Sequence, residues 1–255
     1  MKLMKIVQQQ SGLSRRKARD LIEEGEVTVD GKEEQNPFER YSLEEIDQLY
    51  LRGHPLPTYP PEKRAYKFYK PTGMLCSHDD PHYGRTLGRT LRSEGFIGYR
   101  WAGRLDQDAE GLLLLSNDGQ LVHSLTHPRY EVEKRYHIWI SEKLDHGQIG
   151  GTLERFMEGI EDNGDILQIK EGGVINQGEE HTELELILTE GKKNEIKRLM
   201  EAVDLTIVRL RRVAIGPIEL GDLSPEDIQK VTSEEWEKLR KYKESALAQR
   251  EAEQG

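Results

Sequence analysis

The feature that most constrains how this chain can fold is a proline-rich segment, residues 54–61, with the sequence HPLPTYPP. Prolines stand at four of the seven positions from 55 to 61. Each proline fixes its φ angle and lacks a backbone N–H, so the segment suits neither a helix nor a central strand. We therefore predict a linker at residues 54–61, between a domain at residues 1–53 and a larger domain at residues 62–232. A polar helix is predicted over residues 233–255.

The first domain is predicted to contain two short helices followed by a hairpin. The helices are expected at residues 1–10 and 14–24, and Ser14 has the side chain of a good N-cap for the second. Residues 27–32 favour a strand that enters a tight Asp-Gly turn.

The larger domain shows more strand patterns than helix patterns. Strands are expected at residues 65–69, 112–116, 136–141, 182–189 and 207–215. Helices are expected at residues 150–159 and 194–203. Because the helices do not alternate regularly with the strands, the predicted fold class is α+β. A small helix–helix–hairpin domain is joined to a domain built on a mixed, largely antiparallel sheet with flanking helices.

The charge of the chain is unevenly distributed. The net charge of −10 comes from 37 basic and 47 acidic residues, and it would by itself argue against a polyanionic partner. Residues 141–190 alone hold 13 acidic and 3 basic residues, an excess equal to the whole net charge. The rest of the chain is nearly neutral and has basic clusters at residues 15–19, 192–193, 197–198 and 209–212. An acidic protein can therefore still present a basic face.

Several classes of protein are disfavoured by composition. No apolar run of about 18 residues occurs, and the N-terminal sequence lacks the apolar core of a signal peptide, so we expect a cytoplasmic protein without membrane contact. The single cysteine, Cys76, cannot build a disulfide framework. Two histidine pairs have the x3 spacing of some zinc sites, but no cysteine or known acidic pattern accompanies them, so no metal is expected. Without a P-loop or a G-x-G-x-x-G motif, nucleotide cofactors lack support.

The most informative segment is GRLDQDAEGLLLLSNDG at residues 103–119. Asp106 lies between a glycine–arginine pair and an apolar strand. A carboxylate fixed beside a rigid strand can serve as nucleophile or base if a cation keeps it ionised. From spacing alone, an ordinary loop with solvated charges and a helix or turn cap is the favoured interpretation. A hydrolytic glycosidase that pairs Asp106 with Asp108 or Glu110 is a weaker alternative, because no cluster of aromatic residues lies nearby in the sequence.

This segment resembles the signature of the RsuA-type ribosomal RNA pseudouridine synthases, G-R-L-D-x-x-T/S-x-G-L-L-L-L-T/S-N-D-G. The resemblance extends over nearly the whole chain. Residues 1–60 resemble the small RNA-binding domain named after a ribosomal small-subunit protein. The other matching motifs are KPTG at residues 70–73, EKRY at residues 133–136 and GKKNEIKRLM at residues 191–200.

The resemblance implies an isomerase that converts a specific uridine of ribosomal RNA to pseudouridine after flipping the base, without metal or organic cofactor. It implies that Asp106 is the catalytic carboxylate, that Tyr136 packs on the flipped base, and that Lys197 pairs with Asp106. By the same comparison, Leu199 forms the apolar floor of the pocket and Arg104 contacts the RNA. The implied RNA-binding residues of the first domain are Arg15, Arg16, Lys17, Arg19 and Lys32.

Three further expectations accompany this interpretation. The enzyme is expected to be a monomer, and the acidic residues of the segment 141–190 are expected to lie away from the RNA cleft. Ala109 stands where the family usually has threonine or serine, so a hydroxyl that could brace the loop is missing. The alternatives are a non-catalytic RNA-binding or ribosome-assembly factor, and an enzyme that acts on another RNA such as transfer RNA.

Overall fold

The computed structural model describes residues 1–58, 62–178 and 181–252, and it divides into two compact units. The first unit comprises Met1–Arg64 and Thr90–Arg100, and the second comprises Ala65–Arg89 and Trp101–Gly255. The segment at residues 90–100 was expected in the larger domain but packs with the first unit. This segment packs closely against the end of the first helix. A side chain at Gly12 (φ +71°) would collide with Ile97.

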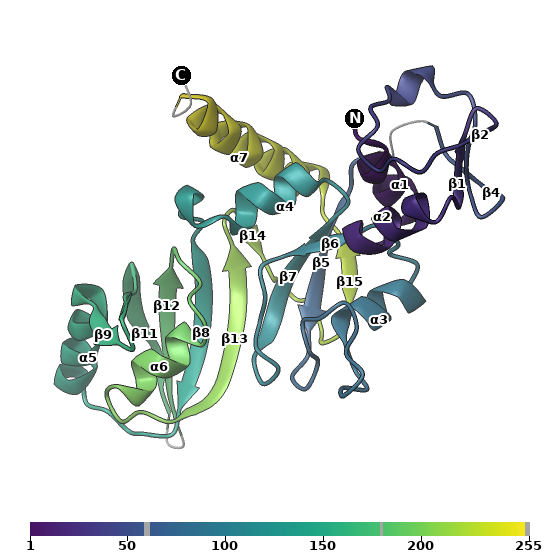
Figure 1. Cartoon of the computed structure of the whole chain (residues 1–255). Coiled ribbons are helices and arrows are strands. Elements are labelled where there is room, and N and C mark those ends of the chain that lie inside the picture. Colours follow the sequence, from purple (N-terminus) through teal and green to yellow (C-terminus); the bar gives the residue numbers. More distant parts are fainter. Residues whose placement is uncertain (59–61, 179–180, 253–255) are drawn as a thin grey trace. The chain divides into compact units, whose positions relative to one another are not determined.

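The first unit combines two helices with a small sheet (Figure 1). Helices α1 (Leu3–Ser11) and α2 (Arg15–Glu23) are joined at Ser14, whose side chain accepts from the Lys17 backbone N–H at 3.2 Å. The predicted N-cap is therefore confirmed. The four-stranded sheet has the order β2 (Lys32–Glu33), β1 (Val27–Val29), β3 (Leu49–Leu51) and β4 (His54–Leu56). A 3-10 helix, η1, covers Leu43–Glu45.

The hairpin between β1 and β2 turns at Asp30 and Gly31, as predicted. Both residues have positive φ angles, 49° and 78°, which is the requirement of the tight turns that match the twist of a hairpin. Apolar side chains from α1, α2, β1 and β3 meet in a core of their own, which includes Ile6, Ala18 and Val27.

The linker prediction is wrong for its first residues. His54–Leu56 forms strand β4, which pairs antiparallel with β3. Proline 55 is tolerated there because β4 is the last strand of the sheet order, where one side of the backbone needs no strand partner. Residues 59–61 of the predicted linker lie outside the described residues.

The second unit is built on a sheet of nine described strands, and the α+β prediction is confirmed (Figure 1). Strand β13 runs parallel to β7, whereas the neighbouring pairs β11–β12, β12–β8, β8–β13, β7–β5 and β5–β15 are antiparallel. The strands in sheet order are β11 (Glu171–Gln177), β12 (Thr182–Leu188), β8 (Lys134–Ile140), β13 (Ile207–Ile215), β7 (Glu110–Ser116), β5 (Ala65–Lys70) and β15 (Ile228–Lys230). Strands β6 (Arg100–Ala102) and β14 (Ile218–Glu219) pair with β7 and β13.

The predicted strands and helices of this unit are present, with shifted ends, together with elements that the pattern missed. Helix α4 (Gly119–Thr126) was not predicted. Asp118 caps it by accepting from the N–H groups of Gln120 and Leu121. The other helices are α3 (Leu87–Ser93), η2 (Pro128–Tyr130), α5 (His146–Glu158), α6 (Glu195–Glu201) and α7 (Ser233–Ala252).

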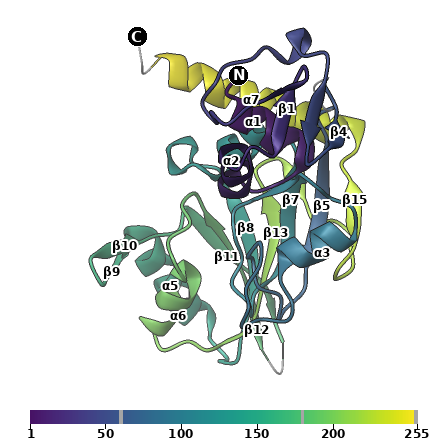
Figure 2. The same ribbon diagram turned by 45° about the vertical axis from the view of Figure 1, so that its right-hand side comes forward.

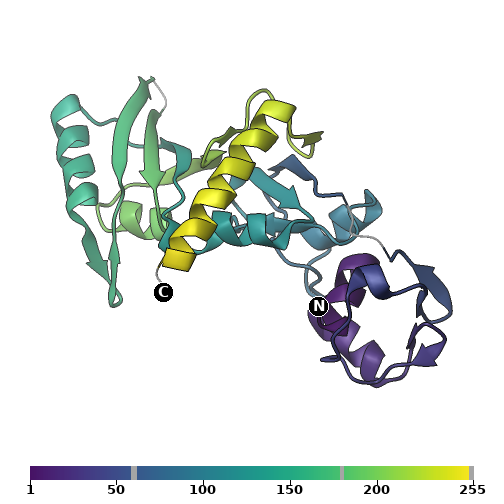
Figure 3. The ribbon, with the colours of Figure 1, turned by 90° about the horizontal axis from the view of Figure 1, so that it is seen from above.

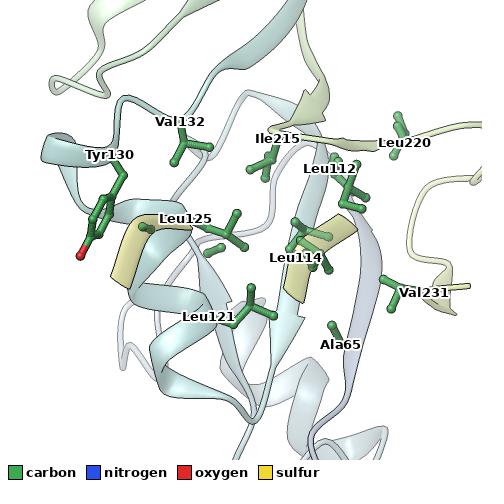
Figure 4. Packing of buried hydrophobic residues seen from close by; sticks show 14 of the residues in the cluster. Ala65, Leu112, Leu114, Leu121, Leu125, Tyr130, Val132, Ile215, Leu220 and Val231 are labelled. Atoms are coloured by element: carbon green, nitrogen blue, oxygen red, sulfur yellow. The ribbon is translucent and has the colours of Figure 1, made fainter. Parts of the chain in front are cut away.

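One face of the sheet is covered by α4 and α7, which lie against each other (Figure 3). Their contacts with β5, β7 and β13 form the core shown in Figure 4, where Leu112 and Leu114 of β7 meet Leu121 and Leu125 of α4. Leu239 of α7 is fully buried in this cluster. Leu247 is another apolar residue of this helix, and its side chain lies outside the described part of the structure. None of the described helices is long and apolar enough to cross a membrane.

The acidic segment forms α5, β11, β12 and a small hairpin of β9 (Ile160–Asp162) and β10 (Asp165–Leu167), seen beside α5 in Figure 2. Arg198 of α6 is ion-paired with Asp162 and Asp165 of this hairpin. Part of the acidic excess thus holds the helix that carries Lys197.

Candidate active site

The loop between β6 and β7, residues 103–109 and here called the signature loop, is held in place through hydrogen bonds to its main-chain carbonyl oxygens. Lys70, a fully buried residue at the end of β5, donates from Nζ to the carbonyl oxygens of Ala109 (2.6 Å), Gln107 (3.3 Å) and Pro71 (3.0 Å). The Gly73 N–H also donates to the Gln107 carbonyl at 2.7 Å. Ala109 has no hydroxyl, so Lys70 braces the loop through main-chain oxygens that any residue supplies.

Asp106 faces two donors from α6 and the residue preceding it. Lys197 Nζ lies 3.5 Å from Asp106 Oδ2 and 2.5 Å from Asp108 Oδ1. With the Asn194 amide oriented to satisfy its hydrogen bonds, its nitrogen donates to Asp106 Oδ2 at 3.0 Å and Oδ1 at 3.3 Å. The expected pairing of Lys197 with Asp106 is therefore present in the geometry, but Lys197 is shared with a second carboxylate.

The charges of this cluster stabilise one another. Burial by itself raises the pKa of Asp108, but the hydrogen bond and charge of Lys197 outweigh it and hold the pKa below its usual range. For Lys197, burial lowers the pKa, whereas the Asp108 hydrogen bond and the charges of Asp106 and Asp108 produce a net rise. Lys197 therefore remains a cation at neutral pH.

A pocket of about 560 Å³ opens over these residues. It is lined by Thr72, Gly73, Asp106, Gln107, Asp108, Asn194 and Lys197. The KPTG turn, the signature loop and the start of α6 thus converge, although they are far apart in the sequence. None of the acidic residues from the described part of the segment 141–190 lines this pocket.

The other candidate residues of this unit do not line the pocket. Leu199, a residue of α6, is fully buried. Tyr136 of β8 is half-buried and stands opposite Arg212 of β13. Arg212 is itself buried and donates to the Leu112 carbonyl (2.9 Å) and the Arg104 carbonyl (3.4 Å), so it connects the strand beside Tyr136 to the signature loop. The Arg104 residue is exposed.

Glu110 does not belong to the cluster that Asp106 and Asp108 form with Lys197. Its side chain, only 9% exposed, is ion-paired with Arg209 and Arg211 of β13. Burial raises the pKa of Glu110, but the hydrogen bonds and charges of both arginines outweigh it and lower the pKa. The structure therefore gives a hydrolytic pair of free carboxylates no support at this position.

The sequence reasoning missed three residues of the site: Lys70, Asp108 as a partner of Lys197, and Asn194. Lys70 and Asn194 lie within the matching motifs, so their position could have marked them. Their contacts depend on which loops meet, and spacing does not show this.

In the first unit, the candidate RNA-binding residues are exposed on α2 and β2. Arg19 forms wide ion pairs with Asp20 and Glu23. Within the residues that the structure describes, the side chains of Arg15, Arg16 and Lys17 form no ion pair. Lys32 is exposed on β2.

The histidine pairs that have zinc-like spacing are His78 with His82 and His123 with His127, and three of these four residues lie against other rings. His123 and His127 contact each other at 4.9 Å between ring centroids, and His78 contacts Trp101 at 4.5 Å. Within the part of the chain that the structure describes, no group of three or more His, Cys, Asp or Glu residues could hold a metal ion.

Comparison with known families identifies both parts of the chain. Residues 66–202 match the RNA pseudouridylate synthase family, and residues 1–44 match the S4 domain. The chain therefore belongs to the RNA pseudouridylate synthase family, with an RNA-binding S4 domain at its N-terminus. It is an isomerase that acts on RNA, and the non-catalytic alternative is set aside.

Relatives with specific names indicate which RNA pseudouridine synthases this chain is similar to. The chain is 32% identical to the ribosomal small subunit pseudouridine synthase A of Vibrio cholerae, covering 92% of this chain and 97% of that protein. It is 34% identical to the protein of the same name from Escherichia coli, covering 92% and 98%. The ribosomal large subunit pseudouridine synthase B of Yersinia pestis is 35% identical over 86% of this chain and 68% of its own length. The RsuA-type resemblance is therefore confirmed.

A solved structure shows the same fold. A crystal structure described as pseudouridylate synthase superposes with a TM-score of 0.62 at 28% sequence identity, covering 94% of this chain and 99% of that one.

Proposed function

We propose that this enzyme isomerises a specific uridine of ribosomal RNA, and that Asp106 is its catalytic carboxylate. The observation that carries the proposal is the position of Asp106. It lines the pocket and faces both Lys197 and Asn194, and its side chain is 42% exposed and so can reach a substrate.

The reaction needs little beyond such a carboxylate. The bond between uracil N1 and ribose C1′ breaks, the uracil turns, and C5 bonds to C1′ while the C5 proton is lost and N1 gains one. No electrons enter or leave, and no metal or organic cofactor is required. Asp106 acts either by attacking C1′ or by removing a ribose proton to give a glycal, and both routes require the ionised form.

Base flipping is part of the proposal, because the reacting atoms of a stacked uridine are inaccessible. Tyr136 would pack on the flipped base, Leu199 would form the apolar floor below it, and Arg104 would fill the gap in the RNA. In this static geometry Tyr136 and Leu199 stand back from the pocket lining, so their roles require that the flipped base reaches deeper than the present opening.

The ribosomal substrate is inferred from the relatives, whose names specify ribosomal subunits. The S4 domain supports an RNA partner, and the exposed cations of α2 and Lys32 would contact its phosphates. We further infer a cytoplasmic monomer, and light scattering coupled to gel filtration would test this against the chain mass of 29.4 kDa.

The catalytic assignment is tested by Asp106→Asn in the full chain. The substitution keeps the shape but removes the charge, so we expect loss of isomerisation with RNA affinity retained. Asp204→Asn is the matched control, because Asp204 is exposed and lies outside the pocket lining. Wild-type turnover by the Asp106 variant would disprove the assignment.

The substrate is tested by mapping pseudouridine in total RNA with and without the protein. The expected result is one ribosomal site that depends on the protein. A dependent site in transfer RNA alone would replace the ribosomal proposal with the alternative substrate.

A further inference from the structure

Asn194 has an unusual conformation for the residue that precedes a helix. It occupies the N-cap position of α6 with φ 53° and ψ 29°, in the left-handed region, whereas N-cap residues ordinarily have extended backbone. Its side chain makes no capping hydrogen bond to the helix. The amide is therefore not used for the purpose that usually favours asparagine at this position.

The amide is used on the carboxylate of Asp106 instead. Its nitrogen lies within hydrogen-bond distance of both Asp106 oxygens, at 3.0 and 3.3 Å, and Asn194 lines the same pocket. Lys197, the cation of this cluster, is nearer to Asp108 (2.5 Å) than to Asp106 (3.5 Å). The contact from Asn194 to Asp106 is thus shorter than the contact from Lys197 to Asp106.

We propose that Asn194 is a positioning residue that orients the Asp106 carboxylate. The inference rests on the proposed catalytic role of Asp106. A donor shared between both carboxylate oxygens fixes the rotation of the carboxylate plane. A neutral amide does this without a titratable proton, so it cannot protonate the group that it orients.

The residue type fits both demands of the position. Asparagine enters the left-handed region more readily than most residues with a side chain, and its short amide places a donor close to the backbone. Glycine would tolerate the backbone but would supply no donor. Aspartate would tolerate the backbone but would place a second negative charge beside Asp106.

These properties define the experiment, which uses the full chain and a transcript containing the mapped uridine. Asn194→Gly removes the amide without straining the backbone, and Asn194→Asp replaces the donor by a charge. Turnover under saturating RNA and RNA affinity are measured for both. Thermal unfolding confirms that the variants fold.

For Asn194→Gly we expect turnover to fall roughly 10-fold, the order expected for one hydrogen bond to a charged group, with RNA affinity nearly unchanged. Asn194→Asp should lower turnover further, because it replaces the donor by a like charge that repels the Asp106 carboxylate.

The outcomes separate this inference from the proposed function. If Asp106→Asn is inactive while Asn194→Gly keeps wild-type turnover, the positioning role is wrong and the catalytic role of Asp106 stands. If Asn194→Gly weakens only RNA affinity, Asn194 is a substrate contact and the inference is overturned. If Asp106→Asn remains active, the proposed function fails first. A lower turnover with unchanged RNA affinity supports the inference.

Discussion

Two basic regions of this molecule use their charges in opposite ways. On α2 of the first unit, Arg15, Arg16 and Lys17 are exposed. In the second unit, Lys197 is ion-paired with Asp106 and Asp108, and Arg209 and Arg211 are ion-paired with Glu110. Both regions look alike in the sequence, as clusters of lysine and arginine.

The difference separates two uses of a cation. Exposed cations attract phosphate over a distance, are screened by salt and tolerate imprecise geometry. Cations fixed against carboxylates set the protonation state and orientation of those carboxylates, and this depends on fractions of an ångström. We therefore expect the α2 region to govern affinity and the Lys197 region to govern turnover.

The largest effect is expected from Lys197→Gln. Without its cation, Asp106 loses its positive partner and part of its fixed position, so turnover under saturating RNA should fall by roughly 10²–10³-fold, as when other preorganised charges are removed. Lys193→Gln is the matched control, because Lys193 is an exposed lysine outside the pocket lining. Single-turnover kinetics measures the effect. If Lys197→Gln changed affinity and left turnover intact, the division between the two regions would fail.

An intermediate effect is expected when Arg15, Arg16 and Lys17 are all replaced by glutamine. RNA affinity at moderate salt should fall roughly 10- to 100-fold, and the slope of log affinity against log salt should decrease by about 2–3 for three lost phosphate contacts. Replacing Lys238, Arg240 and Lys241 of α7 changes the charge equally and serves as control. An unchanged slope would show that α2 does not touch phosphate.

The smallest effect concerns Lys70 and the pH dependence of folding. Burial lowers the pKa of Lys70 to about 8 from 10.5, so the unfolded chain binds this proton more tightly than the folded one between those values. Stability should therefore rise with pH in that window, by at most about 1.4 kcal/mol per pH unit for one proton. Lys70→Met should flatten this rise in urea unfolding curves.

Lys134 provides an internal comparison for that measurement. Burial also lowers its pKa to about 8, and it donates to the Val132, Thr189 and Glu190 carbonyl oxygens, away from the signature loop. Lys134→Met should flatten the rise equally. A rise that persists in the double variant would mean that neither lysine is its source.

The hydrophobic patterns located most of the elements, because burial on one face imposes a period on the residues. The apolar spacing that predicted a helix at residues 194–203 comes from residues such as Ile196, Leu199 and Met200, and all three are buried in α6. The short strands β6, β14 and β15 and the hairpin β9–β10 were missed, because two or three residues are too few to show a period. Helix α4 was missed because its cap, Asp118, stands in a sequence that equally favours a turn.

The acidic segment shows the limit of composition. Its excess of 13 acidic over 3 basic residues was evident in the sequence. The structure adds that Asp162 and Asp165 bind Arg198, next to Lys197, and that no described acid of this segment lines the pocket. That these acids also lie away from bound RNA stays a prediction.

The sequence by itself determined the class of fold and the family motifs, because these are properties of residue type and order. Through the family resemblance, it also predicted that Lys197 pairs with Asp106. Only the tertiary structure decided that Lys197 is shared with Asp108, that Lys70 holds the signature loop and that Asn194 donates to Asp106. Those contacts join residues 37 to 89 positions apart in the sequence. Their existence depends on where separate loops meet, and no local pattern of residues encodes a meeting point.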